Sequence, residues 1–230
     1  MFIDPLYMLM LFPALLLAGI ASMITQSTFS KYSRVPASSG MTGAEAAQRL
    51  LERGGIGNVS IERTGGFLSD HYDPSKRVLR LSENVYDSDS LSAIGVACHE
   101  AGHALQHASH YAPLGLRSAL VPVTQIGTIA PYIIIPLGFI LGSLSLVKIG
   151  IALFAVVVIF SLVTLPVEWN ASARAKELMV ASGIVSPQER ERAARVLNAA
   201  FLTYIASAVS ALLTLLYYLL RSGLLGGRRD

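Results

Sequence analysis

The 230-residue sequence has a single cysteine, Cys98, and only 14% charged residues. One cysteine cannot form an intramolecular disulfide, and it excludes the cysteine-rich metal sites of structural zinc modules. Because neighbouring residues on a helix face different directions, Cys98 is predicted to be a small buried residue beside His99. A soluble domain carries about a quarter charged residues. This scarcity of charge, with 53% hydrophobic residues, predicts an integral membrane protein with a modest polar domain.

The sequence also lacks clusters of Lys and Arg interleaved with aromatic residues, which argues against a nucleic-acid partner. The net charge is +3, and in a membrane protein such an excess is typical of basic residues kept on the cytoplasmic side. No Lys or Arg precedes the first apolar run, so the basic start of a secretory signal is missing. We therefore expect this run to be an uncleaved first span.

The apolar segments predict four transmembrane helices. The first covers residues 5–25, a tight hairpin of two spans covers residues 122–167, and the fourth covers residues 199–220. Pro131 and Pro136 are expected to bend the second span. Residues 111–122 are predicted to form a proline-broken connector, and residues 221–230 a tail without structure.

Two polar segments remain, residues 31–121 and residues 168–198. Thr42 and Glu45 form a capping box that predicts a helix ending near Arg53. A strand at residues 58–63 and a β-hairpin at residues 66–72 and 77–82 follow. Ser88 or Ser90 then caps a helix over residues 91–109. In the second segment a helix is expected from Glu168 to Val180, and Ser186 and Glu189 form a capping box that starts another helix. The fold class is thus mainly α, with a small α+β domain outside the membrane.

The charge distribution predicts the orientation. Fourteen of the 18 Lys and Arg residues lie in residues 31–121 and 168–198. The positive-inside rule places these two segments in the cytoplasm and both chain termini outside.

The predicted helix over residues 91–109 carries the pattern His99-Glu100-Ala101-Gly102-His103. Two histidines four residues apart lie one turn apart on one helix face, where both imidazoles can bind one zinc ion. The glutamate after the first histidine can reach a metal-bound water as a general base. This pattern predicts a metal site with Glu100 as the catalytic residue.

A third ligand must come from elsewhere in the chain. His107 continues the same face, but it lies about 12 Å from His99 along the helix axis, too far for one ion. Glu168 is the best candidate, because two predicted spans separate it from His103 and return it to the same membrane face. Glu177 is a weaker alternative. Further candidates, which resemble turn and cap residues, are Asp70, Asp73, Asp87 and Asp89.

Four segments carry a resemblance to a known family, namely residues 70–74, 78–82, 93–104 and 165–172. Nearly the whole chain resembles the YugP-type membrane zinc metallopeptidases of bacteria, the neutral zinc metallopeptidase family, and more distantly the HtpX and CAAX prenyl protease group. The resemblance implies a zincin-like cytoplasmic domain, one Zn²⁺ held by His99, His103 and Glu168, and a multi-pass protein of the prokaryotic plasma membrane. Ser172 stands where the more distant group has aspartate, so Asn170, Ser172 or a backbone carbonyl would orient the first histidine.

The mechanism implied is hydrolysis of peptide bonds, with Glu100 taking the proton of a zinc-activated water. An oxyanion donor is also needed, and His107, His110, Tyr72 and Arg174 are candidates that the sequence does not rank. Residues 77–82 are a candidate edge strand that pairs with extended substrate, with an ordinary packing role as the alternative.

The first functional hypothesis is a zinc endopeptidase acting on membrane-proximal or unfolded proteins. Its expected partners are a protein or peptide substrate and the lipid bilayer, while a homo-oligomer and a membrane-protein regulator stay open. The alternative is a non-enzymatic scaffold or chaperone-like module whose zinc is structural and closed by four protein ligands. A small transporter is disfavoured, because the predicted spans carry ionisable residues only at their ends.

Overall fold

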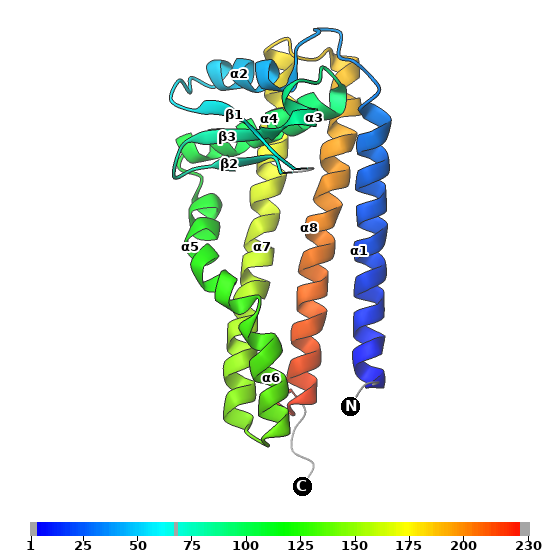
Figure 1. The fold of residues 1–230 in the computed structure, drawn as a ribbon, viewed down its shortest axis with the longest axis vertical. Coiled ribbons are helices and arrows are strands. Elements are labelled where there is room, and N and C mark those ends of the chain that lie inside the picture. Colours follow the sequence, from blue (N-terminus) through cyan, green and yellow to red (C-terminus); the bar gives the residue numbers. More distant parts are fainter. Residues whose placement is uncertain (1–3, 67–68, 226–230) are drawn as a thin grey trace. The chain divides into compact units, whose positions relative to one another are not determined.

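The computed structural model describes residues 4–66 and 69–225 (Figure 1). The chain divides into two compact units, the first made of Met1–Ala21, Leu116–Leu165 and Thr203–Asp230, the second of Ser22–Gly115 and Pro166–Leu202. The helices are α1 (Pro5–Tyr32), α2 (Gly43–Arg53), α3 (Glu83–Tyr86), α4 (Leu91–Ala108), α5 (Ala112–Gly127), α6 (Ala130–Ile140), α7 (Leu144–Ala181) and α8 (Pro187–Arg221). The strands are β1 (Ser60–Thr64), β2 (His71–Asp73) and β3 (Val78–Ser82).

Three helices in the described part of the chain are long and apolar enough to cross a membrane: α1, α7 and α8. The pair α5 and α6 passes the same test only when the two are taken together, and they are bent by 43° at the break between them. Large apolar side chains on these helices are exposed, among them Leu9 at 70% and Ile140 at 71%. These findings agree with the expected membrane protein. The structure has three candidate spans in its described part, and four if α5 and α6 together cross the membrane as one bent span.

The break in the second predicted span lies elsewhere than expected. Residues 111–122, expected as a connector, belong largely to α5, which continues past Pro122. The helix ends at Gly127, and α6 starts at Ala130 with Pro131 in its first turn. A proline there costs no helix hydrogen bond, but it disfavours helical geometry in the residue before it. Pro136 lies inside α6.

The long helices run further than the sequence predicted. Helix α1 continues beyond residue 25 to Tyr32. The expected third span and the helix that starts at Glu168 are one continuous helix, α7, with Pro166 inside it. Ser186 and Glu189 form the predicted capping box, because each donates its backbone N–H to the other's side chain, and α8 then runs unbroken to Arg221. Residues 226–230 of the predicted tail lie outside the described residues.

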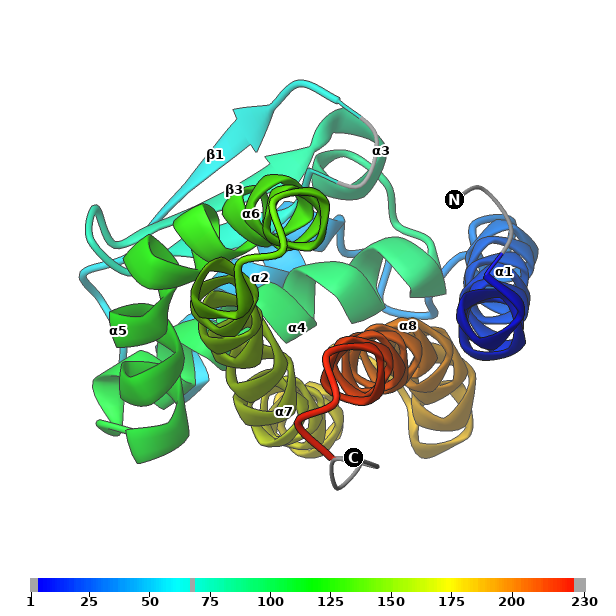
Figure 2. The ribbon, with the colours of Figure 1, turned by 90° about the horizontal axis from the view of Figure 1, so that it is seen from below.

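Within the first unit, α6 and α7 approach each other closely (Figure 2). A Cβ added to Gly138 would come within 2.9 Å of the Val147 backbone nitrogen, and one added to Gly150 within 2.4 Å of Ile135. Small residues thus let the helix backbones pack tightly, as is common in membrane bundles.

The start of α1 and the end of α8 are joined by Asp4, which accepts a hydrogen bond from the Tyr217 hydroxyl at 2.9 Å.

The second unit has its own hydrophobic core, formed where α2 packs beside α4 (Figure 1). Thr42 accepts a hydrogen bond from the backbone N–H of Glu45 at 3.3 Å, and the Glu45 carboxylate accepts one from the Thr42 N–H at 2.8 Å. The predicted capping box is therefore present and starts α2. Its fully buried residues include Leu50 and Leu51, which meet Leu79 and Leu81 of β3 in the core.

The sheet has the order β1-β3-β2. Strand β3 pairs in parallel with β1 and antiparallel with β2, so the predicted hairpin is present as β2 and β3. The expectation that residues 77–82 form an edge strand for substrate is wrong. As the central strand, β3 already uses the hydrogen-bonding groups of both its edges, and the edges of the sheet are β1 and β2.

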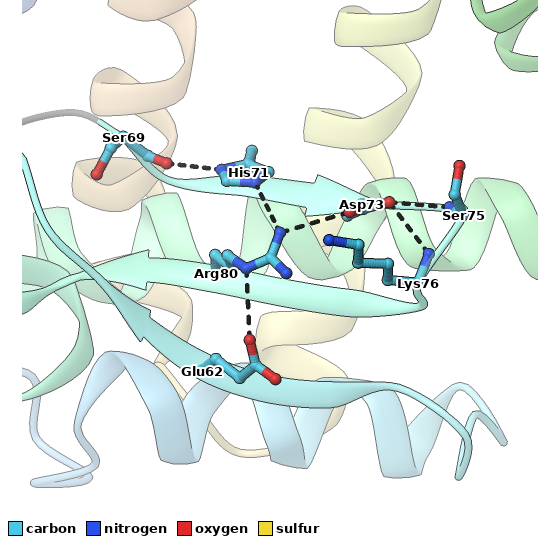
Figure 3. A network of polar contacts seen from close by, with 7 residues as sticks. All are labelled: Glu62, Ser69, His71, Asp73, Ser75, Lys76 and Arg80. Carbon is cyan, nitrogen blue, oxygen red and sulfur yellow. Dashed lines mark hydrogen bonds and ion pairs between the residues drawn. The ribbon is translucent and has the colours of Figure 1, made fainter.

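Arg80 aligns the three strands on the face opposite to Leu79 and Leu81 (Figure 3). Its guanidinium lies 3.4 Å from the Glu62 carboxylate on β1 and 3.4 Å from the Asp73 carboxylate on β2. Asp73 also accepts hydrogen bonds from the backbone N–H groups of Ser75 and Lys76, which shape the hairpin loop. These pairs are partly exposed, and solvent-accessible ion pairs contribute at most about 1 kcal/mol each, so Arg80 links the three strands without adding much stability.

Candidate metal centre

Helix α4 places the two histidines of the motif against α7. Its start is fixed by Ser90, whose hydroxyl accepts the backbone N–H of Ala93 at 3.3 Å. Further along, a Cβ added to Gly102 would lie 2.5 Å from the carbonyl oxygen of Ala171. Only glycine permits this close approach, and the contact brings residues 99–103 of α4 beside residues 168–172 of α7.

His99, His103 and Glu168 form a group able to hold one metal ion, with their ligand atoms all within 4.8 Å of one another. The Nε2 atoms of His99 and His103 lie 3.1 Å and 3.5 Å from the same Glu168 oxygen, Oε2. Ligands at zinc–ligand distances of 2.0–2.1 Å in a tetrahedron are separated by about 3.3 Å. The donor types and their spacing therefore fit zinc. No fourth His, Cys, Asp or Glu joins this group among residues 4–66 and 69–225.

The other ring nitrogen of each histidine is held by a neutral side chain. His99 Nδ1 lies 3.0 Å from the Ser172 hydroxyl, and His103 Nδ1 lies 3.0 Å from Gln106 Oε1. An amide oxygen only accepts, so His103 carries its proton on Nδ1 and keeps the Nε2 lone pair for a metal. Of the three alternatives for orienting the first histidine, the structure thus brings Ser172 to the ring.

Gln106 is itself fully buried and held in one orientation. Its amide nitrogen donates to the Val167 carbonyl at 2.7 Å and to Asn170 Oδ1 at 3.1 Å. Arg174 Nε donates to the same Asn170 oxygen at 2.8 Å. Asn170 and Arg174, predicted as possible supporting residues, therefore reach the site through Gln106.

Gln106 was not among the supporting residues predicted from the sequence. A usable signal existed, because residues three apart on a helix share a face and Gln106 is three residues after His103.

Glu100 lies on α4 between the two histidines in sequence. Burial raises the pKa of the Glu100 carboxyl above its ordinary value, while the neighbouring His99 and His103 act in the opposite direction. Burial also acts to lower the pKa of His103, but Glu168 and Glu100 outweigh it and the pKa lies above the ordinary value. A carboxyl group with a raised pKa is better suited to accept and return a proton near neutral pH.

The remaining predicted residues lie in other contacts. The Tyr72 hydroxyl is 2.8 Å from His107 Nδ1, so these two candidate oxyanion donors bind each other. Neither belongs to the metal-binding group, and neither does Glu177, which is exposed. Cys98 is fully buried, as predicted.

Three of the acidic candidates, Asp70, Asp73 and Asp87, contact backbone groups or a basic side chain and do not belong to the metal-binding group. Asp70 accepts hydrogen bonds from the backbone N–H and the hydroxyl of Ser82. Asp87 pairs with Arg63, and Asp73 shapes the hairpin loop.

Residues 7–223 match the model of a family described as "Putative neutral zinc metallopeptidase", and the chain belongs to this family. It is similar to "Putative membrane protease YugP" of Bacillus subtilis (strain 168). The two chains are 47% identical over 216 residues, which cover 94% of this chain and 96% of the relative. No solved structure matches the chain.

Proposed function

We propose that this protein is a membrane zinc endopeptidase whose metal is held by His99, His103 and Glu168. The observation that carries the proposal is the convergence of two Nε2 atoms on one Glu168 oxygen, with Glu100 on the same helix as the two histidines and outside the ligand group. The family and the similar membrane protease support a proteolytic role. A zinc ion in this site would polarise the scissile carbonyl and lower the pKa of a bound water.

The chain's own residues would then carry the proton. Glu100 accepts a proton from the attacking water and delivers it to the leaving amine. Ser172 and Gln106 hold the two imidazoles in the orientation that points Nε2 at the metal position. Such supporting partners typically change metal affinity about 10–100-fold when they are removed.

The test separates metal binding from chemistry. His99→Ala should lose zinc, measured as metal content per chain of the purified full-length protein. Glu100→Gln should keep one zinc per chain and lose about 10²–10⁴-fold in hydrolysis of an unfolded protein substrate. Full activity in Glu100→Gln would refute the assigned mechanism.

The alternative is a scaffold with structural zinc, and it predicts a different coordination. A structural site is closed by four protein ligands, whereas a catalytic one leaves a position for water. X-ray absorption on the zinc-loaded protein distinguishes the two. Three N/O protein ligands with one water would support the peptidase, and four protein ligands would support the scaffold.

We further propose that the second unit faces the cytoplasm of a prokaryotic plasma membrane and acts on membrane-proximal or unfolded proteins. The charge bias of the sequence supports this orientation. The only cysteine is buried, so introduced cysteines can be labelled with little background. Ser75→Cys, in the hairpin loop, should resist a membrane-impermeant maleimide in intact cells. Leu141→Cys, in the turn after α6, should react, and the reverse pattern would overturn the orientation.

A further inference from the structure

A pocket of about 320 Å³ lies in the second unit, beside the C-terminal end of α4. Its volume is within the range of about 300–1,000 Å³ that is typical of small-molecule sites. The polar groups that line it include Arg77, His107, His110 and Tyr72. No acidic residue is among the described residues that line the pocket, so its charge complements an anion.

Two lining residues have an unusual backbone. Arg77, with φ of 54°, and His110, with φ of 50°, are the two non-glycine residues with positive φ in the described part of the chain. Both line this one pocket. Left-handed backbone costs a non-glycine residue about 1 kcal/mol or more, and such residues collect at functional sites.

His110 occupies a position just after the end of α4 where glycine is the usual residue. The N–H of His110 donates to the carbonyl of His107, and the N–H of Tyr111 donates to the carbonyl of Gln106. These two bonds form a Schellman motif, in which the left-handed residue after the helix is most often glycine. A histidine at this position therefore brings a ring to the pocket at a conformational cost that glycine would avoid.

His107 is fixed so that it can contribute a donor. The Tyr72 hydroxyl, from strand β2, lies 2.8 Å from His107 Nδ1. When the hydroxyl donates to Nδ1, the neutral ring carries its proton on Nε2 and can donate a hydrogen bond from there. Arg77 adds a permanently charged guanidinium, whose fork matches the two oxygens of a carboxylate.

The pocket is close to the candidate metal centre along α4. His107 follows His103 by four residues, which is about 6 Å along the helix axis. An extended peptide advances about 3.4 Å per residue, so this distance corresponds to about two substrate residues. A substrate residue within two positions of the scissile bond could reach the pocket.

We infer that this pocket, formed by Arg77, His107, His110 and Tyr72, is a subsite that binds a carboxylate of the substrate peptide within two residues of the cleaved bond. The inference rests on the proposed peptidase function. The carboxylate is either that of an Asp or Glu side chain or that of a free C-terminus, because both present the same two oxygens to Arg77.

Binding to the zinc-loaded, full-length Glu100→Gln protein tests the inference without turnover. Fluorescein-labelled octapeptides carry one glutamate at successive positions in an otherwise uncharged, C-terminally amidated sequence, and a matched series carries glutamine. A third peptide has no glutamate and a free C-terminal carboxylate. Fluorescence anisotropy should show about tenfold tighter binding of one glutamate peptide than of its glutamine counterpart, as expected for charge-assisted hydrogen bonds. If only the free C-terminus gives the gain, that end is the carboxylate recognised.

Glycine variants remove the pocket side chains without straining the fold. Arg77→Gly and His110→Gly, each made in the Glu100→Gln protein, place glycine where φ is positive, so both variants should fold at least as well as the parent. In each variant, the ratio of the dissociation constants of the glutamine and glutamate peptides should fall toward one. Lys76→Ala is the matched control, because Lys76 is the exposed basic residue next to Arg77 and is not among the residues that line the pocket. This control should keep the preference.

The outcomes separate the inference from the proposed function. Equal binding of all the peptides, or no binding, would overturn the inferred carboxylate subsite. A preference for the carboxylate that survives Arg77→Gly, or that disappears in Lys76→Ala, would also overturn it. Hydrolysis of the same peptides by the wild-type protein is measured in parallel. Cleavage without carboxylate preference refutes the subsite alone, whereas carboxylate-dependent binding without cleavage of these peptides or of an unfolded protein refutes the peptidase and leaves only a site that binds peptide carboxylates.

Discussion

Replacing Gln106 with leucine should weaken zinc binding, although Gln106 is not a ligand. In Gln106→Leu, His103 Nδ1, the Val167 carbonyl and Asn170 Oδ1 lose the partner that the buried amide provides. Loss of a partner that orients a metal-binding histidine costs about 10–100-fold in affinity, which is about 1.4–2.8 kcal/mol. Asn170 Oδ1 keeps its hydrogen bond from Arg174, and the Val167 carbonyl lies inside α7, so the further folding cost is mainly that of the buried His103 ring nitrogen, about 1–3 kcal/mol.

The assay is competition for zinc between the purified protein and a chelating dye, at a temperature well below unfolding. Gln106→Glu separates orientation from stability, because its carboxylate still accepts from His103 but no longer donates to the Val167 carbonyl. This variant should keep near wild-type zinc affinity and lose stability. Ser82→Ala removes a buried hydroxyl that binds Asp70, away from the candidate ligands, and controls for destabilisation alone. Wild-type zinc affinity in Gln106→Leu would refute the positioning role.

Three further outcomes are expected. Gly102→Ala places a Cβ 2.5 Å from the Ala171 carbonyl oxygen, so α4 and α7 must separate, which should lower the unfolding free energy by about 1–3 kcal/mol in denaturant titrations. The backbone N–H and hydroxyl of Thr42 hold the pKa of Glu45 below its ordinary value of 4.5. The stabilisation of the folded state that these hydrogen bonds to ionised Glu45 provide is complete above pH 4.5 and disappears as the pH falls through the lower pKa of the folded protein. Thr42→Ala should therefore lower the unfolding free energy more at pH 7 than at pH 3, measured by urea unfolding. Adding zinc to chelator-treated protein at 100 times its Kd should stabilise it by about 2.7 kcal/mol in thermal unfolding, and His103→Ala should abolish the gain.

Local signals in the sequence were sufficient to locate α4 and to select three candidate ligands. The spacing of His99 and His103 needs only helical geometry. Glu168 was found because two spans return the chain to one membrane side, a count that is insensitive to where each helix ends. The capping residues Thr42 and Ser186 marked two helix starts in the same local way.

Features set by long-range packing were not predictable. The order β1-β3-β2 follows from the pairing of β1 with β3 across the intervening hairpin, and no local pattern encodes that choice. Helix α7 is continuous through Pro166, although a proline inside a helix removes one hydrogen bond and usually bends or ends the helix. Proline occurs on both sides of the break before Ala130, so proline alone does not locate the break.

The neutral partners of both histidines bear on the chemistry of the proposed centre. His99 Nδ1 faces the Ser172 hydroxyl and His103 Nδ1 faces the Gln106 amide oxygen, so neither Nδ1 atom is paired with a carboxylate. A divalent cation held by two neutral imidazoles and the Glu168 carboxylate would keep one unit of positive charge. A carboxylate partner on either ring would transfer electron density to that cation and raise the pKa of a water bound to it. If zinc binds as proposed, the serine at residue 172 would favour a more acidic water, and Glu100 would be the base that accepts its proton.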